Sequence, residues 1–462
     1  MFEYQSALST RYGSKKMRAV FSDYCKYKHW RKCWIALAKA QKELGLLITD
    51  EQIQALEDNV NNIDLKLAAT FESQFNHDVM AQLYAFGEQA PIAKGILHLG
   101  ATSAFVSDNG EILMQKAAMD LIKEKLTIII RRLAKQAELY ADMPTVGFTH
   151  YQMAQPTTIG KRLALYLQDF VSDYEQLLEW QHTLKLRGAK GTTGTQASYL
   201  LLFDQDVDKV AKLDALIADY LGIDDTYLIT SQTYPRKRDS QTLSLLSMIA
   251  QSAHKLAVDF RLMQHDGLVS EPFGSHQIGS SAMAYKRNLI LCEKICGLSR
   301  KVMIDALNGP MTASNQWLER TLDDSSNRRL VIAEAFIIID EILVSTQKVL
   351  EGMVIYPGKI RQQLQEYLPF LATEPILMAI ANKGQDRQLW HEHIRQQSML
   401  ITQFQMDPWT LIENLQKIEG FPLTKEELDA LLKPDQFIGL AAQQTHEYLK
   451  HIESIIKESN HD

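Results

Sequence analysis

Residues 271–288 form a polar stretch with side chains suited to acid–base chemistry on an anionic substrate. The stretch has neither helix nor strand periodicity, and Gly274 and Gly279 allow its backbone to bend. Before the next helical pattern it carries two hydroxyls, two cations and an amide: Ser280, Ser281, Lys286, Arg287 and Asn288. Hydroxyls beside cations suit a loop that closes over an anion and then acts on it. A polar crossover between two helices explains the composition equally well.

Three shorter segments carry further candidates, and each also has a purely structural interpretation. The pair His77-Asp78 fits local capping more readily than a site. Thr102 and Ser103 can cap the next helix, and the same helix N-terminus can attract an anion. His150 by itself is typical of a loop histidine bonded to backbone. Residue types alone therefore leave these segments open between structure and function.

Two other segments are rich in glycine or in positive charge. Residues 188–196 suggest a phosphate loop, but no strand precedes them and the Gly-Lys-Ser/Thr order is absent. We expect a crossover whose backbone N–H groups point at a ligand. Residues 231–238, which include Gln232, form a basic patch that is either a solvated loop or a pocket wall.

The order of these motifs along the chain resembles one protein family. The run Gly279-Ser-Ser-Ala-Met-Ala-Tyr-Lys-Arg-Asn288 resembles the signature loop of the fumarase/aspartase superfamily, in the form used by adenylosuccinate lyases. Further stretches match in the same order: Thr10-Arg-Tyr12, His77-Asp-Val-Met80, His98-Leu-Gly-Ala-Thr-Ser103, Gly147-Phe-Thr-His150, Lys190-Gly-Thr-Thr-Gly-Thr-Gln196 and Glu319-Arg-Thr-Leu-Asp-Asp-Ser325. This ordered set spans nearly the whole chain and is most similar to the branch that includes the animal enzymes.

The resemblance implies a β-elimination that breaks a C–N bond and releases fumarate. The substrates implied are adenylosuccinate, which gives AMP, and the succinylaminoimidazole carboxamide ribotide (SAICAR) of purine nucleotide biosynthesis, which gives AICAR. Ser280 matches the family's base, which takes a proton from the carbon beside a carboxylate, and His150 matches the acid that protonates the departing nitrogen. We expect Lys286, Arg287 and the N-terminus of the following helix to stabilise the Ser280 alkoxide.

The resemblance also implies three groups of substrate-binding residues. The succinyl carboxylates would be held by Lys286, Asn288, Thr102 and Ser103. The phosphate and ribose would be held by Arg11, Tyr12, Arg320, Ser325 and Arg329, and arginine suits this role because it pairs in bidentate fashion. The base and the succinyl group would be oriented by His77, Asp78 and Gln232. Two further positions complete the expected substrate-binding set: Thr149 and Lys294.

Five positions depart from the family pattern. Ala284, Leu289 and Met153 stand where proline is usual, and Asn76 and Lys294 stand where the animal-type enzymes have arginine. The lost loop prolines leave the empty loop more freedom, so its closure costs more entropy. The lost arginines predict weaker nucleotide binding. Because the proposed acid, base and carboxylate-binding residues are all present, we expect an active enzyme.

Long helices must position these segments. Apolar residues recur every three or four positions in five stretches: 112–142, 161–187, 241–265, 289–307 and 328–354. Helices of this length bury their apolar stripes in a bundle. Glycine and proline, at 22 and 12 residues of 462, are few, which also favours long helices. We predict an all-α fold with three domains: 1–103, a central long-helix bundle at 104–356, and 357–462.

Assembly is predicted from two apolar runs and from the resemblance. Residues 127–130 and 335–340 are apolar beyond one helix face, which suggests burial against other subunits. The resemblance implies a homotetramer with a twenty-helix core and with each active site shared between subunits.

The composition excludes several other classes of protein. A net charge of −7 argues against a nucleic-acid-binding surface. The N-terminus lacks the charged start and apolar run of a signal peptide, and no apolar run approaches the length that spans a bilayer. Cys25, Cys33, Cys292 and Cys296 fit reduced packing residues of a cytoplasmic protein. We expect no metal, no cofactor and no membrane partner.

Two other interpretations remain open. One is a different fumarate-releasing lyase of the superfamily, such as argininosuccinate lyase or a carboxymuconate cycloisomerase. The phosphate-type residues Arg11, Arg320 and Arg329 argue against it, because those substrates carry no phosphate. The other is a non-catalytic paralogue, which the missing prolines allow and the intact Ser280 and His150 oppose.

Restoring proline at positions 284 and 289 should order the signature loop, defined here as residues 271–288, and slow its proteolysis, because proline removes freedom from the empty loop. Limited digestion of the wild type and of the Ala284→Pro/Leu289→Pro variant measures this effect. Equal digestion rates would rule out the lost prolines as a source of loop mobility.

Overall fold

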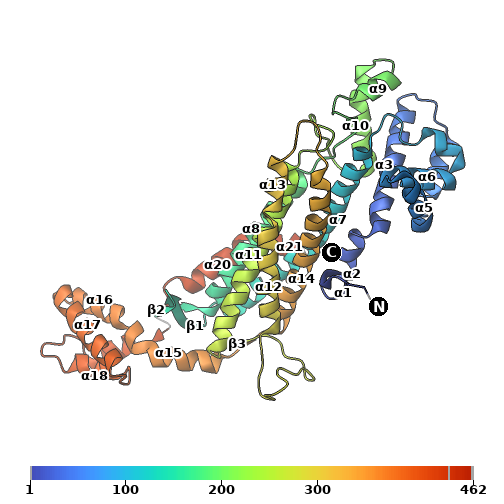
Figure 1. Ribbon diagram of the computed structural model, residues 1–462. Helices are drawn as coiled ribbons and strands as arrows, with labels where there is room; N and C mark the ends of the chain where they lie inside the picture. Colours follow the sequence, from blue (N-terminus) through green and yellow to red (C-terminus); the bar gives the residue numbers. More distant parts are fainter. Residues whose placement is uncertain (1–2, 435–436, 459–462) are drawn as a thin grey trace. The chain divides into compact units, whose positions relative to one another are not determined.

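The structure, a computed structural model, describes residues 3–434 and 437–458. It is mainly helical, with two small antiparallel sheets in the described part of the chain, so the all-α prediction is confirmed (Figure 1). The chain forms two compact units. Unit 1 holds the described residues of 1–126, 172–253 and 294–344, and unit 2 those of 127–171, 254–293 and 345–462. The three-domain division made from the sequence stays a prediction.

All five long helices predicted from apolar periodicity are present. They are α7 (Ser103–Leu139), α8 (Ile159–His182), α11 (Lys237–His265), α12 (Ile290–Asp305) and α14 (Asp323–Gly352). The largest difference is at α7, which begins at Ser103 rather than at 112, because its start follows the Thr102-Ser103 capping signal and not the apolar period. Each of these helices contributes one end to unit 1 and the other end to unit 2.

Shorter helices complete both units. Those of unit 1 are α1 (Ala7–Thr10), α2 (Lys15–Val20), α3 (Asp23–Glu43), α4 (Asp50–Asp58), α5 (Leu65–Phe75), α6 (Asp78–Gln89), the 3-10 helix η1 (Pro91–Ile96), α9 (Ala197–Leu202), α10 (Val207–Leu221) and α13 (Asn308–Ser314). Those of unit 2 are α15 (Pro357–Leu371), α16 (Thr373–Asn382), α17 (Arg387–Gln403), α18 (Thr410–Gln416), α19 (Lys425–Leu431), α20 (Ala441–His451) and α21 (Glu453–Glu458). The predicted capping box of Thr49 and Gln52 is formed at the start of α4.

A β-hairpin occupies the connection between α7 and α8, where the sequence predicted only a loop. β1 (Pro144–Thr149) pairs antiparallel with β2 (Gln152–Thr158). The register shifts beside Gly147, where a Cβ atom would lie 2.4 Å from the Gln155 carbonyl oxygen. The bulge therefore requires glycine. It also interrupts the alternation of side chains between two faces that would have indicated a strand. In a second pair, β3 (Val269–Ser270), which directly precedes the signature loop, lies antiparallel to β4 (Val354–Ile355).

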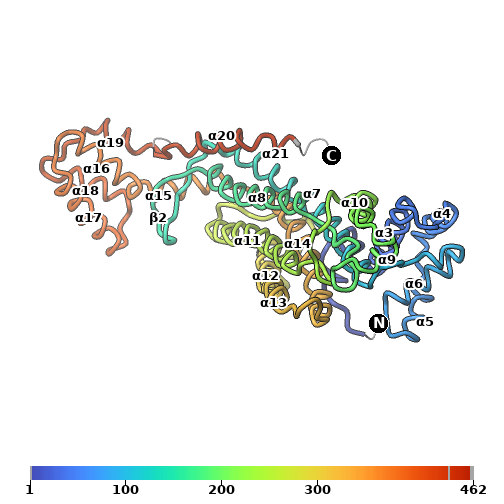
Figure 2. The backbone as a smooth tube through the Cα atoms, turned by 90° about the horizontal axis from the view of Figure 1, so that it is seen from above, coloured from blue at the N-terminus to red at the C-terminus, as the bar shows by residue number. Residues whose placement is uncertain are grey.

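The two apolar runs taken as a sign of other subunits are only partly buried within the single chain. Ile129 and Ile130 in α7, and Phe336 and Ile339 in α14, are all 0% exposed. Ile128 and Ile337 in the same runs are only half-buried, so the burial of these runs against other subunits stays a prediction. In unit 2, α16, α17 and α18 pack around a separate core that includes Trp390 (Figure 2).

Large exposed apolar side chains are also frequent in the stretch from the end of α12 through α13 to the start of α14. They include Ile304, Leu307, Met311, Trp317, Leu318 and Leu322, which are 57–93% exposed. So many large apolar side chains exposed within one short stretch of a chain are unusual on a monomer. Among the described residues, no helix has the length and apolar character needed to cross a membrane.

Candidate active site

The Ser280 hydroxyl lies at a tight turn in the signature loop of unit 2. Its Oγ accepts hydrogen bonds from the backbone N–H groups of Ala282 (3.2 Å) and Met283 (3.0 Å). N–H groups that donate to an oxygen stabilise its ionised form, so this turn favours the alkoxide that a serine base requires. The stabilising donors are thus found within the loop itself.

The N-terminus of α12, which was expected to assist Ser280, is already occupied. The Glu271 carboxylate accepts the backbone N–H groups of Leu291 and Cys292, both at 3.1 Å. A carboxylate at this position neutralises the helix N-terminus. This part of the expected alkoxide stabilisation is therefore corrected: local N–H groups, and not the helix end, reach the hydroxyl.

The part of the loop around Ser280 is closed by Asn288 and Gly279. Asn288 Nδ2 donates to the Gly279 carbonyl oxygen at 2.7 Å. A Cβ atom on Gly279 would lie 1.8 Å from the Lys286 carbonyl oxygen, so only glycine fits there. In this structure the Asn288 amide, predicted to bind a carboxylate, ties the loop together. Lys286 is exposed.

His150 lies at the tip of the β1–β2 hairpin in unit 2. His150 and Tyr151 form its two-residue turn, with φ of 52° and 55°. Such turns usually carry Asn-Gly, because a left-handed backbone costs conformational free energy at most other residues. Two bulky residues at these positions therefore store strain, which is typical of a functional site. The turn projects an exposed imidazole, and Thr149 pairs with Gln152 directly beneath it.

In unit 1, His77 and Ser103 come together although 26 residues separate them. His77 caps α6, with its Nδ1 accepting the Met80 N–H at 3.4 Å, and its Nε2 lies 3.4 Å from Ser103 Oγ. Thr102 immediately precedes Ser103 at the start of α7, and Asp78 begins α6. The structure thus joins two segments that the sequence had proposed separately for the succinyl group.

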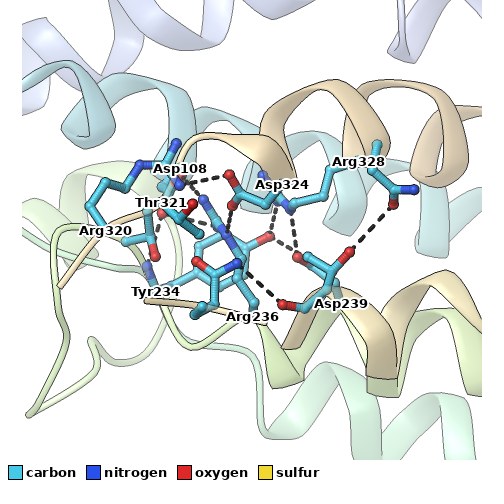
Figure 3. Close-up of polar contacts among 12 residues, drawn as sticks. Asp108, Tyr234, Arg236, Asp239, Arg320, Thr321, Asp324 and Arg328 are labelled. Atoms are coloured by element: carbon cyan, nitrogen blue, oxygen red, sulfur yellow. Dashed lines mark hydrogen bonds and ion pairs between the residues drawn. The ribbon is translucent and has the colours of Figure 1, made fainter. Parts of the chain in front are cut away.

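Arg320 is held by a buried ion network in unit 1 (Figure 3). Its Nη1 donates to Asp324 Oδ1 at 2.7 Å, and the other Asp324 oxygen accepts from Arg236 Nε at 2.7 Å. Arg236 also forms a bidentate pair with Asp108 at 3.1 and 3.2 Å. Burial alone would raise the pKa of Asp324, but Arg236 and Arg320 lower it. The shared carboxylate therefore stays ionised and fixes the Arg320 guanidinium.

A second part of the same network joins three helices. Arg328 of α14 donates to Asp239 of α11 at 2.7 Å and to Glu111 of α7 at 2.6 Å. Its Nη2 also donates to the Tyr234 hydroxyl, which in turn donates to Asp239 at 2.6 Å. This part of the network fixes the first turn of α14, which carries Ser325, while Arg329 on the next residue is exposed. The basic patch at 231–238 is thus largely buried and neither a solvated loop nor an open wall.

The remaining candidates of unit 1 are linked through the carboxylate of Glu341. They are Arg11, Tyr12 and Lys294. The Gly13 N–H, directly after Arg11 and Tyr12, donates to Glu341 Oε2 at 3.1 Å, and Lys294 pairs with Glu341 at 2.6 Å. Lys294 is therefore brought beside the Arg11-Tyr12 turn, as a nucleotide-binding role would require.

Three further positions in unit 1 refine or correct the sequence interpretation. The Gln232 N–H donates to the Glu319 carbonyl oxygen at 3.1 Å, which places Gln232 beside the Arg320 segment. Asn76 adopts a left-handed conformation at the end of α5, where asparagine is favoured and arginine is not. The glycine-rich run at 188–196 differs from expectation, because Asp214 and Asn109 accept its first N–H groups.

Sequence reasoning missed the residues that hold this machinery in place. Asp324, Arg236 and Glu271 had no assigned role, because each has a partner that lies between 20 and about 130 residues away in sequence. The only sequence signal was indirect: an arginine at 236 and an acidic pair at 323–324 lie within motifs already singled out.

Comparison with known proteins identifies sequence relatives over the whole chain. Residues 10–304 match a family described as lyase, and residues 369–448 match one described as adenylosuccinate lyase C-terminus. The adenylosuccinate lyases of Schizosaccharomyces pombe and Saccharomyces cerevisiae are each 44% identical to this chain, covering 96% and 97% of it and 94% of their own lengths. That of Schistosoma mansoni is 40% identical over 97% of this chain and 94% of its own length.

Solved structures show the same fold. The 3-carboxy-cis,cis-muconate lactonizing enzyme from Pseudomonas putida superposes with a TM-score of 0.84, covering 99% of this chain and 100% of its own at 23% identity. At that identity the likeness concerns the fold alone. It confirms the fumarase/aspartase-like architecture predicted from the sequence.

Acid should destabilise the turn before Thr102, because this turn contains the partly buried His98. Trp34 Nε1 donates to His98 Nδ1 at 2.8 Å, and burial together with the nearby His77 lowers the pKa of His98 to about 4. The neutral ring therefore contributes stability above about pH 6.5, its unfolded pKa, and this is lost as the pH falls towards 4. The loss amounts to at most about 3 kcal/mol.

The variant His98→Gln keeps an acceptor for Trp34 but does not titrate. Thermal unfolding at pH 7.5 and pH 4.5 should therefore show the wild type losing more Tm than this variant. Parallel losses in both proteins would contradict a neutral, buried His98.

Proposed function

The chain belongs to the adenylosuccinate lyase family and is a carbon–nitrogen lyase, and from this premise we propose which residues carry out its reaction. The reaction is the β-elimination of fumarate from adenylosuccinate, which leaves AMP, and SAICAR is the second substrate typical of the family. The observation that carries the assignment of residues is the Ser280 turn, where two backbone N–H groups converge on one hydroxyl oxygen in the family's signature loop.

Ser280 acts as the base in this proposal. Its alkoxide removes the proton from the succinyl carbon beside a carboxylate, and the electron pair moves into that carboxylate. The N–H groups of Ala282 and Met283 lower the free energy of the alkoxide. Lys286 holds the carboxylate on which negative charge develops.

His150 acts as the acid. As the C–N bond breaks, the imidazolium donates its proton to the departing nitrogen of the purine, so fumarate and AMP leave with all charges balanced. The strained two-residue turn supports this role, because it fixes the position of the ring on a short hairpin rather than on a long loop.

Most of the proposed binding residues come from unit 1. The nucleotide phosphate and ribose lie against Arg11, Tyr12, Arg320, Ser325 and Arg329, with Lys294 beside them. Thr102, Ser103 and the His77–Asp78 pair receive the succinyl group, together with Asn288, Thr149 and Gln232. The observation that supports the phosphate role is Asp324, which holds Arg320 in place before any ligand binds.

We further propose a homotetramer in the cytoplasm that serves purine nucleotide biosynthesis. The exposed apolar surface at 304–322 supports assembly, since it would be costly to leave in water. Cys25, Cys33, Cys292 and Cys296 form no disulfide among the described residues, which fits a reducing compartment. In the tetramer, His150 and Ser280 of one site come from different subunits, with His77 from a third or shared neighbour.

His150→Ala and Ser280→Ala should each lower kcat by about 10² to 10⁴, which is the usual contribution of a general acid or base. The matched control for His150→Ala is Tyr151→Ala in the same turn, and the matched control for Ser280→Ala is Ser281→Ala in the same loop. Steady-state release of fumarate from adenylosuccinate measures the effect. Near-normal turnover in a folded His150→Ala or Ser280→Ala protein would remove that residue from its role.

Mixing the two inactive variants tests whether sites are shared. After dissociation and random reassociation in equal amounts, about one quarter of the sites in a closed symmetric tetramer would draw His150 and Ser280 both from intact donors. Activity should therefore recover to roughly that fraction of wild type. Remixed variants that stay as inactive as their parents would show that both residues serve the site from one chain.

A further inference from the structure

The two ends of the signature loop are joined by two side chains to which the mechanism gives no role. Glu271, at the start of the loop, reaches across to the N–H groups of Leu291 and Cys292, just after its end. Gln264, near the end of α11, accepts the Glu271 N–H through Oε1 at 3.1 Å and donates through Nε2 to the Arg287 carbonyl oxygen at 3.3 Å. Glu271 and Gln264 therefore form a clamp that brackets the loop.

The clamp replaces a local cap for α12. Its first residue is Ile290, and the preceding Leu289 has no side-chain oxygen to accept the free N–H groups of the helix. Glu271 satisfies two of them from 20 residues upstream, while 4% exposed. Burial raises the pKa of Glu271, and the N–H groups of Leu291 and Cys292 oppose this rise. The Glu271 carboxylate is thus buried at the position where it joins the two loop ends, and the two N–H groups offset the cost of its burial.

Beyond the clamp, the loop has little to hold it. Figure 1 shows the segment between β3 and α12 as a loop without helix or strand. Ile278 is 82% exposed and Tyr285 is 84% exposed, so these large side chains pack on little of the described chain. Within the loop, Asn288 closes the part that contains Ser280. The position of this Ser280 segment relative to α11 and α12 therefore depends on keeping the loop ends together.

We propose that Glu271 and Gln264 are positioning residues of the lyase reaction, which hold the signature loop so that Ser280 and Lys286 are presented together to the substrate. This inference rests on the proposed role of Ser280. Neither clamp residue touches the reacting atoms. Their effect is to lower the entropy that the loop loses when it closes, and a displacement of about 1 Å at the base can cost about 10²-fold in rate.

Glu271→Gln should lower kcat for fumarate release by about 10- to 100-fold, with a smaller change in KM, because an amide NH₂ group faces one of the two N–H donors. Gln264→Leu, which removes both of its hydrogen bonds, should have an effect in the same direction and keeps the test valid if Glu271→Gln fails to fold. Gln277→Ala is the matched control. Gln277 accepts the Gly274 N–H at 3.0 Å inside the loop without joining its ends, so kcat should stay within about 3-fold of wild type.

Two further measurements separate positioning from general stability. Hydrogen exchange across residues 272–289 should quicken in both clamp variants and not in Gln277→Ala, while exchange in α7 is unchanged. Adding Ala284→Pro/Leu289→Pro to Glu271→Gln should raise its kcat at least about 5-fold. The prolines remove backbone freedom from the loop, and this offsets the freedom that the loop gains when the clamp is broken. Neither the Ala284 nor the Leu289 N–H donates a hydrogen bond among the described residues, so the prolines displace none.

The outcomes distinguish this proposal from the assignment of Ser280. Wild-type kcat and wild-type exchange in both clamp variants would overturn the clamp while leaving Ser280 as the base. A loss of kcat in Glu271→Gln that the prolines do not restore, with unchanged loop exchange, would also overturn it. If Ser280→Ala keeps full activity, the proposed base is wrong, and the exchange measurement still decides whether Glu271 and Gln264 order the loop.

Discussion

The buried ion network around Arg236 and Arg328 is the constraint on which the binding side of the structure depends. It links α7 through Asp108 and Glu111, the segment before α11 through Tyr234, and α14 through Asp324. Taking so many charges out of water is costly, and removing one partner typically costs about 3–5 kcal/mol because the other charge is left buried. Such a network adds little to stability compared with apolar packing, but it fixes the guanidinium of Arg320, the proposed phosphate ligand.

The proposed acid and base are held in a different way. His150 and Ser280 lie on a hairpin tip and on an exposed loop of unit 2, where hardly any packing fixes them. Their positions come from backbone geometry: two residues with positive φ at the hairpin, and two N–H groups that converge on the serine oxygen. An exposed loop held at its ends suits a lyase that would close over its substrate and then release two products.

The sequence predicted what depends on local patterns. The five long helices follow from apolar periodicity, and the start of α4 follows from the capping box of Thr49 and Gln52, because both signals lie within a few residues. The roles of Glu271 and Asp324 could not be predicted, since their partners are distant in sequence. The hairpin was missed because Gly147 breaks the strand pattern.

Release of products from adenylosuccinate is the measurement that tests the central claim most directly. The purified chain, incubated with adenylosuccinate, should form AMP and fumarate in equal amounts, and Ser280→Ala measured alongside should form them far more slowly. SAICAR should give AICAR and fumarate in the same way. A folded wild-type protein that releases no fumarate from either substrate would contradict the account, and would favour a non-catalytic member of the family.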